Sequence, residues 1–401
     1  MKIINTFAYT VIASTFVLAI SGCDSTPKER AKQLSQKLII TDTHVDVPYR
    51  LERQTDDVSQ ATAQGDFDFP RAKSGGLDAP FMSIYVPAKL EAEGGSKQLA
   101  DKLIDGVEAI VAKSPDKFAL ALSWNDIEKN FSEGKISLPM GMENGSPIEH
   151  DLNNLTHFYS RGIRYITLAH SLSNHISDSS YDDNRPAGGL TDFGKDVVKE
   201  MNRLGIMVDV SHISDDAFTD VMKISQVPVI ASHSSARHFT PGFERNMSDE
   251  MIKQLAKNGG VIFINYGSSF ISKDYQDWSN EYRAARSNFI KQKKLNGDSR
   301  TVEEFDQYYL SEYPKKYATL DQVLDHFDHV KELVGVDHLG IGSDYDGVGD
   351  SLPTGLKDVS SYPNLIEGLL NRGYTEQDIE KILSGNLKRV WLAVEKFSQQ
   401  N

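Results

Sequence analysis

The sequence predicts an α/β protein built as a (β/α)8 barrel of the TIM type, with one extra strand and a helical insertion. First, the chain has 401 residues of ordinary globular composition, 39% hydrophobic and 25% charged, which is enough to bury a full core. Second, short apolar runs alternate with helix-like stretches, a pattern typical of a parallel sheet that is covered on both faces. Third, ionisable residues follow the ends of several of these runs, where barrel proteins place their functional groups.

Nine short apolar runs are expected to form strands, one more than a barrel needs. They are Leu38–Asp42, Pro80–Val86, Phe118–Leu122, Ser137–Met142, Ile163–Ala169, Ile206–Val210, Pro228–Ala231, Gly260–Tyr266 and His338–Gly342. Helical periodicity separates most of them and is clear in Asp215–Ile224, Asp249–Leu255, Leu320–Leu333 and Glu376–Leu383. A doubly wound sheet would need a nucleotide-binding glycine loop, and the only approach to one, at 340–342, is too short and badly placed.

Residues 38–397 are expected to form a single catalytic barrel domain, because no low-complexity linker divides them. The segment 273–316 is polar, charged and rich in Tyr, so we expect it to be an insertion over one barrel face. The formal charge is −14 and no basic block stands out, which argues against nucleic acid as a partner. A single Cys excludes an internal disulfide.

The first 22 residues differ from the rest and are expected to be a lipoprotein signal peptide. Lys2 precedes the apolar stretch Thr6–Ile20, which is shorter than the roughly 20 residues that span a bilayer. The small residues before Cys23 resemble a bacterial lipobox, so Cys23 would carry a lipid and residues 23–37 would form a tether. The alternative is a buried Cys at a plain signal-peptide border. Asp24 resembles an inner-membrane retention signal, so the expected location is the bacterial cell envelope, facing the periplasm or the exterior.

Ionisable side chains follow six of the expected strands. They are His44 and Asp46, Glu143, His170, His212, His233, and Asp344. The carboxyl ends of parallel barrel strands share one face, so we expect these side chains to meet there. One histidine at a strand end is more often structural than functional, but four of the chain's 11 occur at such ends.

Five of these residues supply nitrogen and oxygen ligands and no thiolate: His44, Asp46, Glu143, His212 and His233. A single tetrahedral zinc is filled by four protein groups, or by three and a water. Five groups that include a carboxylate able to bridge fit two metals roughly 3.5–4 Å apart. The sequence therefore predicts a metal site with two ions, for which zinc is favoured, although manganese and cobalt accept the same ligands.

The motifs around these residues resemble those of the membrane (renal-type) dipeptidases, a zinc family within the amidohydrolase-like barrels. The opening motif is Asp42-Thr43-His44-Val45-Asp46-Val47-Pro48. Further matches are Tyr165-Ile166-Thr167-Leu168-Ala169-His170-Ser171, Asp209-Val210-Ser211-His212, Ser232-His233-Ser234-Ser235-Ala236, Arg245-Asn246-Met247, Gly342-Ser343-Asp344-Tyr345-Asp346-Gly347 and Ser384-Gly385-Asn386-Leu387-Lys388-Arg389-Val390. The similarity runs in order from about residue 38 to 395, while the segment 273–316 matches poorly.

The resemblance implies how the metals are held. One zinc would bind His44 and Asp46, the other His212 and His233, and Glu143 would bridge them. It also implies that a metal-bridging hydroxide hydrolyses dipeptides that have a free C-terminal carboxylate, and that the protein forms a homodimer.

The resemblance further assigns residues to the substrate. His170 would bind the substrate carbonyl, Arg245 the free carboxylate, and Asp344 would handle the proton. Tyr266, at another strand end, is either a substrate contact or a packed side chain. On the residues alone, Arg245 could equally be a helix-start residue that pairs with Asp249 or Glu250.

Two other functions are consistent with parts of the sequence. A barrel deaminase or cyclic-amide hydrolase could use similar ligands but would have no use for Arg245. A binding lipoprotein without turnover would have a two-lobed sheet and no need for Asp344 together with His170. A metal assay and a dipeptide hydrolysis assay with and without chelator separate the three.

Overall fold

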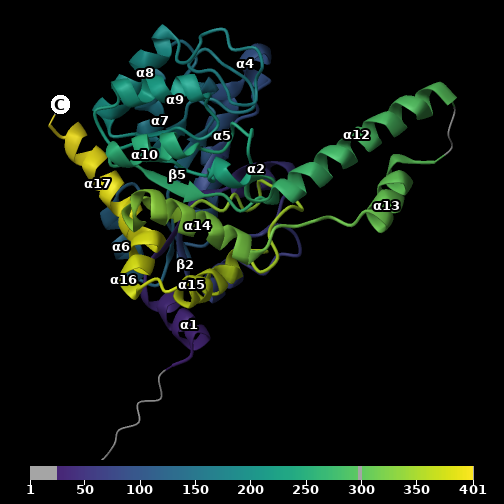
Figure 1. Cartoon of the computed structure of the whole chain (residues 1–401). Helices are drawn as coiled ribbons and strands as arrows, with labels where there is room; N and C mark the ends of the chain where they lie inside the picture. Colours follow the sequence, from purple (N-terminus) through teal and green to yellow (C-terminus); the bar gives the residue numbers. More distant parts are fainter. Residues whose placement is uncertain (1–24, 297–299, 401) are drawn as a thin grey trace, which may run out of the picture.

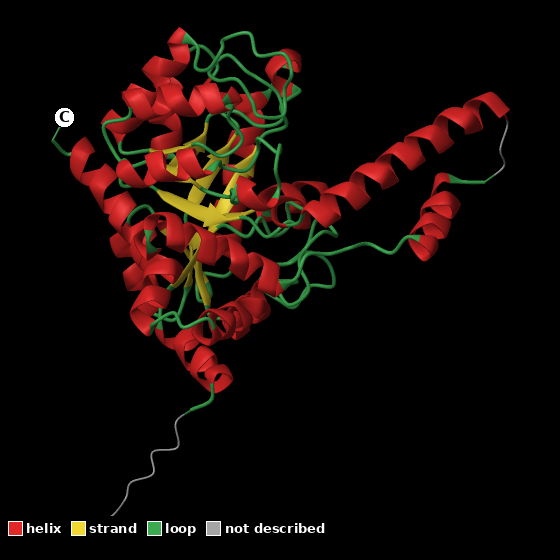
Figure 2. Cartoon of the chain, viewed as in Figure 1, coloured by secondary structure: helices red, strands yellow, loops and turns green. Residues whose placement is uncertain are grey.

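Eight parallel strands form the centre of the molecule and close into a barrel, which confirms the expected fold class (Figures 1 and 2). The computed structural model describes residues 25–296 and 300–400. In sheet order the strands are β1 (Ile40–Val45), β2 (Leu77–Tyr85), β5 (Met140–Glu143), β6 (Ile163–Thr167), β7 (Met207–Asp209), β8 (Ile230–Ala231), β9 (Val261–Ile264) and β10 (Leu339–Ile341). Beyond β10 the chain returns to β1, where Asp344 N donates to His44 O at 3.1 Å and Asp46 N to Tyr345 O at 2.9 Å.

The extra strand is in fact a pair of short strands outside the barrel. β3 (Phe118–Leu120) pairs in parallel with β4 (Ile136–Leu138). The expected strand 137–142 is divided at Pro139, which has no N–H for a ladder hydrogen bond. Only the part after Pro139, β5, joins the barrel. Glu143 is its last residue and therefore lies at the end of the barrel where the strands have their carboxyl ends, which is called the upper end below.

Helices surround the barrel on its outside (Figure 2). They are α2 (Val47–Arg53), α3 (Phe69–Gly75), α4 (Leu90–Glu93), α5 (Ser96–Lys113), α6 (Trp124–Ser132), α7 (Asn153–Ser160), α8 (Asp192–Leu204), α9 (Asp215–Ile224), α10 (Asp249–Lys257), α11 (Ser268–Ile271), α14 (Leu320–Val334), α15 (Tyr362–Asn371), α16 (Glu376–Glu380) and α17 (Asn386–Ser398). α8 shows why such segments are helical. Thr191 caps its N-terminus, Gly205 ends it in a left-handed conformation, and Val197, Val198 and Met201 form its buried face.

Aromatic side chains fill the barrel interior below the site. Phe81 and Tyr165 lie 5.5 Å apart, and Phe81 also contacts Trp391 of α17 at 5.5 Å. A glycine on the neighbouring strand makes room for the Tyr165 ring, because a Cβ on Gly141 would lie 2.0 Å from it. The interior of the barrel is therefore packed below the site.

The N-terminal part of the described chain is a helix and not a tether. α1 (Pro27–Lys37) begins with a capping box made by Thr26 and Glu29. Its buried residues Ala31 and Leu34 belong to the hydrophobic core, and the helix packs on α15. The expected tether 23–37 is wrong for residues 27–37. The signal peptide 1–22 and Cys23 lie outside the described residues.

The insertion is a helical hairpin that extends away from the barrel (Figure 1). α12 (Lys273–Asn296) and α13 (Val302–Glu312) contact each other through stacked rings, such as Phe289 on Phe305 at 4.6 Å. Of the two helices, only the base of α12 lies over the barrel face as expected. There, Tyr275 and Arg283 line a cavity. Within 25–296 and 300–400, no helix combines the length and apolar character that crossing a bilayer requires.

Candidate active site

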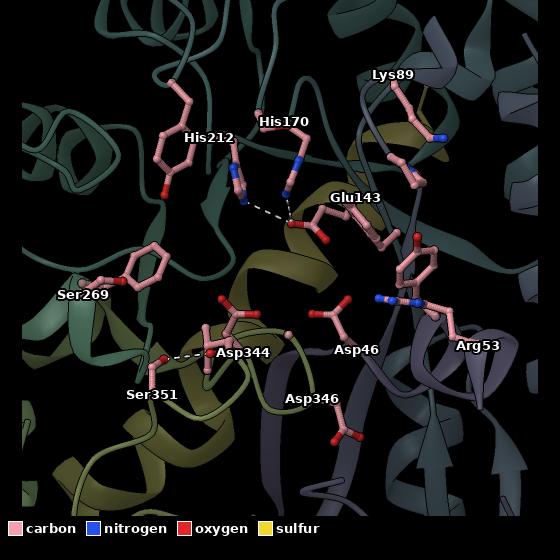
Figure 3. Close-up of a pocket in the computed structure, with 18 of the residues that line it drawn as sticks. Asp46, Arg53, Lys89, Glu143, His170, His212, Ser269, Asp344, Asp346 and Ser351 are labelled. Carbon is pink, nitrogen blue, oxygen red and sulfur yellow. Dashed lines mark hydrogen bonds and ion pairs between the residues drawn. The ribbon is translucent and has the colours of Figure 1, made fainter. Parts of the chain in front are cut away.

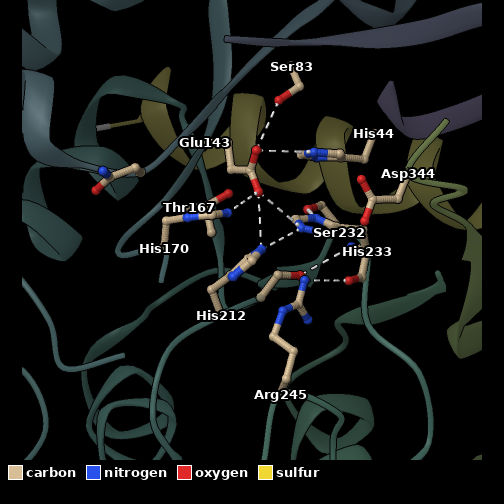
Figure 4. Close-up of polar contacts among 12 residues, drawn as sticks. His44, Ser83, Glu143, Thr167, His170, His212, Ser232, His233, Arg245 and Asp344 are labelled. Atoms are coloured by element: carbon tan, nitrogen blue, oxygen red, sulfur yellow. Dashed lines mark hydrogen bonds and ion pairs between the residues drawn. The ribbon is translucent and has the colours of Figure 1, made fainter. Parts of the chain in front are cut away.

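All seven expected strand-end groups converge at the upper end of the barrel, around Glu143 (Figure 4 labels six of them, and Figure 3 labels Asp46). His44 belongs to β1 and Asp46 follows it, while the loops after β6, β7 and β8 supply the remaining histidines. The members of the group are His44, Asp46, Glu143, His170, His212, His233 and Asp344. Their nitrogen and oxygen atoms form three overlapping trios with a spacing suited to a metal ion.

The two carboxylate oxygens of Glu143 face different partners. Oε2 lies 3.4 Å from His44 Nε2, which is itself 3.4 Å from Asp46 Oδ2. Oε1 lies 3.1 Å from His212 Nε2 and 3.4 Å from His233 Nε2. Oε1 is also 3.4 Å from His170 Nε2, so the structure places this histidine among the candidate ligands as well. One carboxylate thus joins two sets of ligand atoms.

Buried partners orient the ring of His233. Its Nδ1 lies 2.7 Å from Ser232 Oγ, and that hydroxyl donates to Asp209 Oδ2 at 2.6 Å. Ser232 Oγ therefore accepts the Nδ1 proton, and Nε2 carries a lone pair. His233 Nε2 faces His212 Nε2 at 2.8 Å, a short separation that a cation bound between them would explain.

His44 is oriented in the same way by a tyrosine. Tyr165 Oη donates its proton to Thr43 O at 2.9 Å. The same oxygen lies 3.0 Å from His44 Nδ1 and therefore accepts a hydrogen bond from the Nδ1 proton. His44 Nε2 and Asp46 Oδ1 are buried and have no hydrogen-bond partner among the described residues. Unpaired buried polar atoms are costly, and a cation would satisfy both. The residues present therefore fit a metal site made of nitrogen and oxygen ligands.

The protonation states of His212, His233 and Glu143 suit metal binding. Burial holds the pKa of His212 and of His233 well below the usual value, so both rings are neutral and can act as ligands. Burial acts to raise the pKa of Glu143, but the charges of His44 and His170 and the hydrogen bond of His212 hold it well below its usual range. Glu143 is therefore an anion at neutral pH.

Asp344 faces the ligands from the end of β10. Its backbone is left-handed, with φ of 65°, as is that of His212 with φ of 70°. Such strain in non-glycine residues is concentrated at functional sites. Asn265 Nδ2 donates to Asp344 Oδ2 at 2.8 Å. Burial raises the pKa of the Asp344 carboxyl well above its usual value, and the carboxylates of Asp46 and Glu143 raise it further. Asp344 can therefore carry a proton.

Arg245 contacts the segment that carries His233 and lies ahead of α10, whose N-cap is Ser248, and not at a helix start. Its Nη1 donates to Ser234 Oγ and its Nη2 to His233 O, both at 2.8 Å. The ion pair considered with Asp249 is not formed, since Asp249 binds His329 at 2.8 Å. The Arg245 side chain is 3% exposed, and its Nε has no partner among the described residues.

Tyr266 does not line the cavity. It is fully buried, and its ring packs edge-to-face against Tyr345 at 5.9 Å. Successive residues of a strand face opposite sides, and here Asn265, one position earlier, faces Asp344. The packing alternative therefore fits Tyr266. The alternation at the end of β9 is the signal that could have identified Asn265.

A cavity of about 770 Å³ opens above Glu143 (Figure 3). Asp46, Glu143, His170, His212 and Asp344 lie at its floor. Its walls contain residues that sequence reasoning missed: Tyr49, Arg53, Tyr85, Lys89, Tyr181, Ser269, Phe270, Tyr275 and Arg283. Tyr85 is the last residue of β2, and the others come from loops and helices, whose position relative to the strand ends no local pattern reveals.

Known proteins show the same architecture. The probable dipeptidase PvdM from Pseudomonas aeruginosa is 27% identical, with a TM-score of 0.80 over 92% of this chain and 99% of its own. A metallo peptidase from Rhodobacter sphaeroides, solved with a phosphinate mimic of the dipeptide L-Ala-D-Ala, is 25% identical, with a TM-score of 0.73 over 89% of this chain and 99% of its own. An amidohydrolase from Pseudomonas aeruginosa, 22% identical with a TM-score of 0.70 over 92% and 99%, shares the fold.

The match to a known family covers nearly the whole chain. The sequence model of the membrane dipeptidases, peptidase family M19, matches residues 28–401. This range includes all of helix α1 except Pro27, and every ligand candidate at the barrel mouth. The chain therefore belongs to the membrane dipeptidase family, peptidase family M19, and is a metal-dependent dipeptidase.

Proposed function

We propose that the chain uses two zinc ions to cleave dipeptides that have a free C-terminal carboxylate. The observation that carries this proposal is the orientation of Glu143, whose two oxygens face two different sets of ligand atoms. His44 and Asp46 would hold one ion, and His212 and His233 the other. When bound, two divalent ions lower the pKa of a water molecule and polarise the scissile carbonyl.

The residues beside this centre have complementary roles. His170 lines the cavity, its side chain is 19% exposed, and its Nδ1 has no partner among the described residues. We assign it to the carbonyl oxygen of the substrate, where negative charge develops. Asp344, with its raised pKa, would hold the proton that the departing amine requires.

Arg245 is the proposed partner of the substrate's carboxylate. Its guanidinium stacks over the ring of Phe270 at 5.1 Å, and Phe270 lines the cavity. Each Nη nitrogen uses one N–H inward, which leaves the other N–H and the unpaired Nε for a ligand. A planar fork of this kind binds a carboxylate in a bidentate manner, which would restrict the enzyme to short peptides.

Hydrolysis of a dipeptide with and without a chelator tests the proposal. We expect turnover that the chelator abolishes and that added Zn²⁺ restores, with Mn²⁺ and Co²⁺ as comparison ions. Turnover of a cyclic amide but not of dipeptides would favour the amide-hydrolase alternative. Metal or peptide binding without turnover would favour a binding lipoprotein.

We also propose a lipid anchor on Cys23, with the barrel facing the periplasm or the exterior and the inner membrane favoured by Asp24. The support is the lipobox-like end of the apolar segment 6–20. Cys23→Ser should yield an uncleaved or unlipidated precursor whose barrel stays active. A variant that remains membrane-bound at the normal mature size would contradict the anchor. We further propose that the protein forms a homodimer. Measurement of the mass of the purified protein in solution tests this.

A further inference from the structure

One wall of the cavity has positive charge without strong partners. Arg53 is the last residue of α2, and Lys89 precedes α4 (Figure 3). Among the described residues Arg53 pairs with no carboxylate, and its guanidinium contacts only the ring of Tyr49 at 5.8 Å. Lys89 lies 3.4 Å from Glu93, but both side chains are exposed, so this ion pair is weak.

The acidic residues of the cavity do not neutralise this wall. Asp346 accepts from Arg50 Nε at 2.9 Å, and this pair is largely buried. Asp46 and Asp344 lie with His44 in one of the candidate metal-binding trios. In a chain of net charge −14, an unneutralised positive wall inside the cavity is a local exception that would attract an anionic ligand.

The position of Arg245 indicates which end of a bound dipeptide would face Arg53 and Lys89. Arg245 stacks on Phe270, and Ser269, next to Phe270, lies across the cavity from Arg53 and Lys89 (Figure 3). The next step rests on the proposed function. If the C-terminal carboxylate binds Arg245 and the scissile bond lies over Glu143, the N-terminal residue points toward Arg53 and Lys89.

We infer that this site selects dipeptides whose N-terminal residue has an acidic side chain, with the carboxylate bound by Arg53 and Lys89. Arg53 offers a planar fork for the carboxylate, and Lys89 adds a point charge. Tyr49 and Tyr85, packed edge-to-face at 4.8 Å, form the surface between them and the floor. The apolar rings would contact the methylene groups of a Glu side chain.

The test compares Glu-Ala with Gln-Ala, because the two dipeptides have the same size and differ in one charge. We expect kcat/KM to favour Glu-Ala roughly tenfold, as for a charge-assisted hydrogen bond in a partly exposed site. The preference should weaken as the salt concentration rises, since the wall is exposed. In Arg53→Gln/Lys89→Gln the ratio should fall to about one.

Matched controls separate this inference from the proposed function. Lys199→Gln, on the exposed face of α8, makes the same change of charge away from the cavity and should keep the Glu-Ala preference. Arg53→Glu should instead favour Lys-Ala. Equal rates for Glu-Ala and Gln-Ala in the unaltered enzyme would overturn the inference and leave the dipeptidase proposal standing. If neither dipeptide were cleaved while a cyclic amide was, both would be overturned.

Discussion

The floor and the rim of the cavity are built differently. At the floor, His44, Glu143 and His233 lie on or directly after barrel strands, are buried, and have partners that fix their orientation. At the rim, Arg53 and Lys89 are exposed and come from a helix end and a loop. A rigid, buried floor suits chemistry that requires fixed distances, whereas an exposed rim can change without disturbing the fold.

The difference predicts a graded response to mutation. Changes at the floor should remove metal or chemistry, changes between floor and rim should alter substrate recognition, and changes at the opposite end of the barrel should alter stability alone.

Glu143→Gln should have the largest effect. We expect both metal ions to be lost in part and activity to fall by at least roughly 10⁴-fold, because the rate enhancement of enzymes is commonly 10⁶-fold or more and depends here on the metals. Metal analysis of the purified variant gives the occupancy. Glu200→Gln, on the surface of α8, is the matched control. Loss of only one ion would show that Glu143 does not bridge.

Asp344→Asn should separate proton transfer from metal binding. Metal content should stay near normal while turnover falls by about 10²–10⁴-fold, the effect of losing a general acid–base. A dipeptide and its C-terminal amide should suffer alike, because the proton is needed for both. If metal content fell together with turnover, Asp344 would belong to the ligand set instead.

Arg245 should affect recognition of the carboxylate. We expect a dipeptide amide to be cleaved at least thirty-fold more slowly than the free dipeptide, since a lost buried charge pair costs on the order of 2–5 kcal/mol. Arg245→Ala should cause a similar loss on the free dipeptide and almost none further on the amide. Equal rates for dipeptide and amide in the unaltered enzyme would remove Arg245 from the site and favour the cyclic-amide alternative.

Asp78, at the start of β2, should affect only stability. Burial raises its pKa to about 7, although it accepts a hydrogen bond from Ile40 N at 3.0 Å. The folded protein therefore binds more protons than the unfolded chain between about pH 4 and 7, and stability falls as the pH rises through this window. Asp78→Asn should be more stable than the unaltered protein at pH 8, by on the order of 2 kcal/mol, with little difference near pH 4.

Denaturant unfolding at the two pH values measures this effect, and the exposed Asp116→Asn is the control. Equal stabilisation by Asp78→Asn at both pH values would mean that Asp78 does not titrate in this range.

Features that depend on strand ends could be predicted from the sequence. The carboxyl ends of parallel strands meet at one edge, so His44, Glu143 and His233 could be grouped without a structure. The sequence-based expectations were wrong where contacts between segments distant in the sequence determine the structure. The apolar face of α1 consists of only two buried residues, Ala31 and Leu34, and the helix packs on α15, which is distant in the sequence, so no local pattern predicts that it is folded against the barrel.

Local geometry explains the other errors. Pro139 divided one expected strand in two, and the alternation of side chains at the end of β9 turned Tyr266 into the core and Asn265 toward Asp344. No sequence pattern pointed to Arg53 and Lys89, because exposed Arg and Lys are common on any surface. Only the fold places these two in the same cavity as the candidate metal ligands.

Metal content per chain, measured on a fully active preparation, distinguishes a centre of two metal ions from a centre of one. We expect about two divalent ions per chain, with loss of dipeptide hydrolysis when a chelator removes them and recovery when zinc returns. A content near one ion per chain at full activity would contradict the two-metal centre built around Glu143.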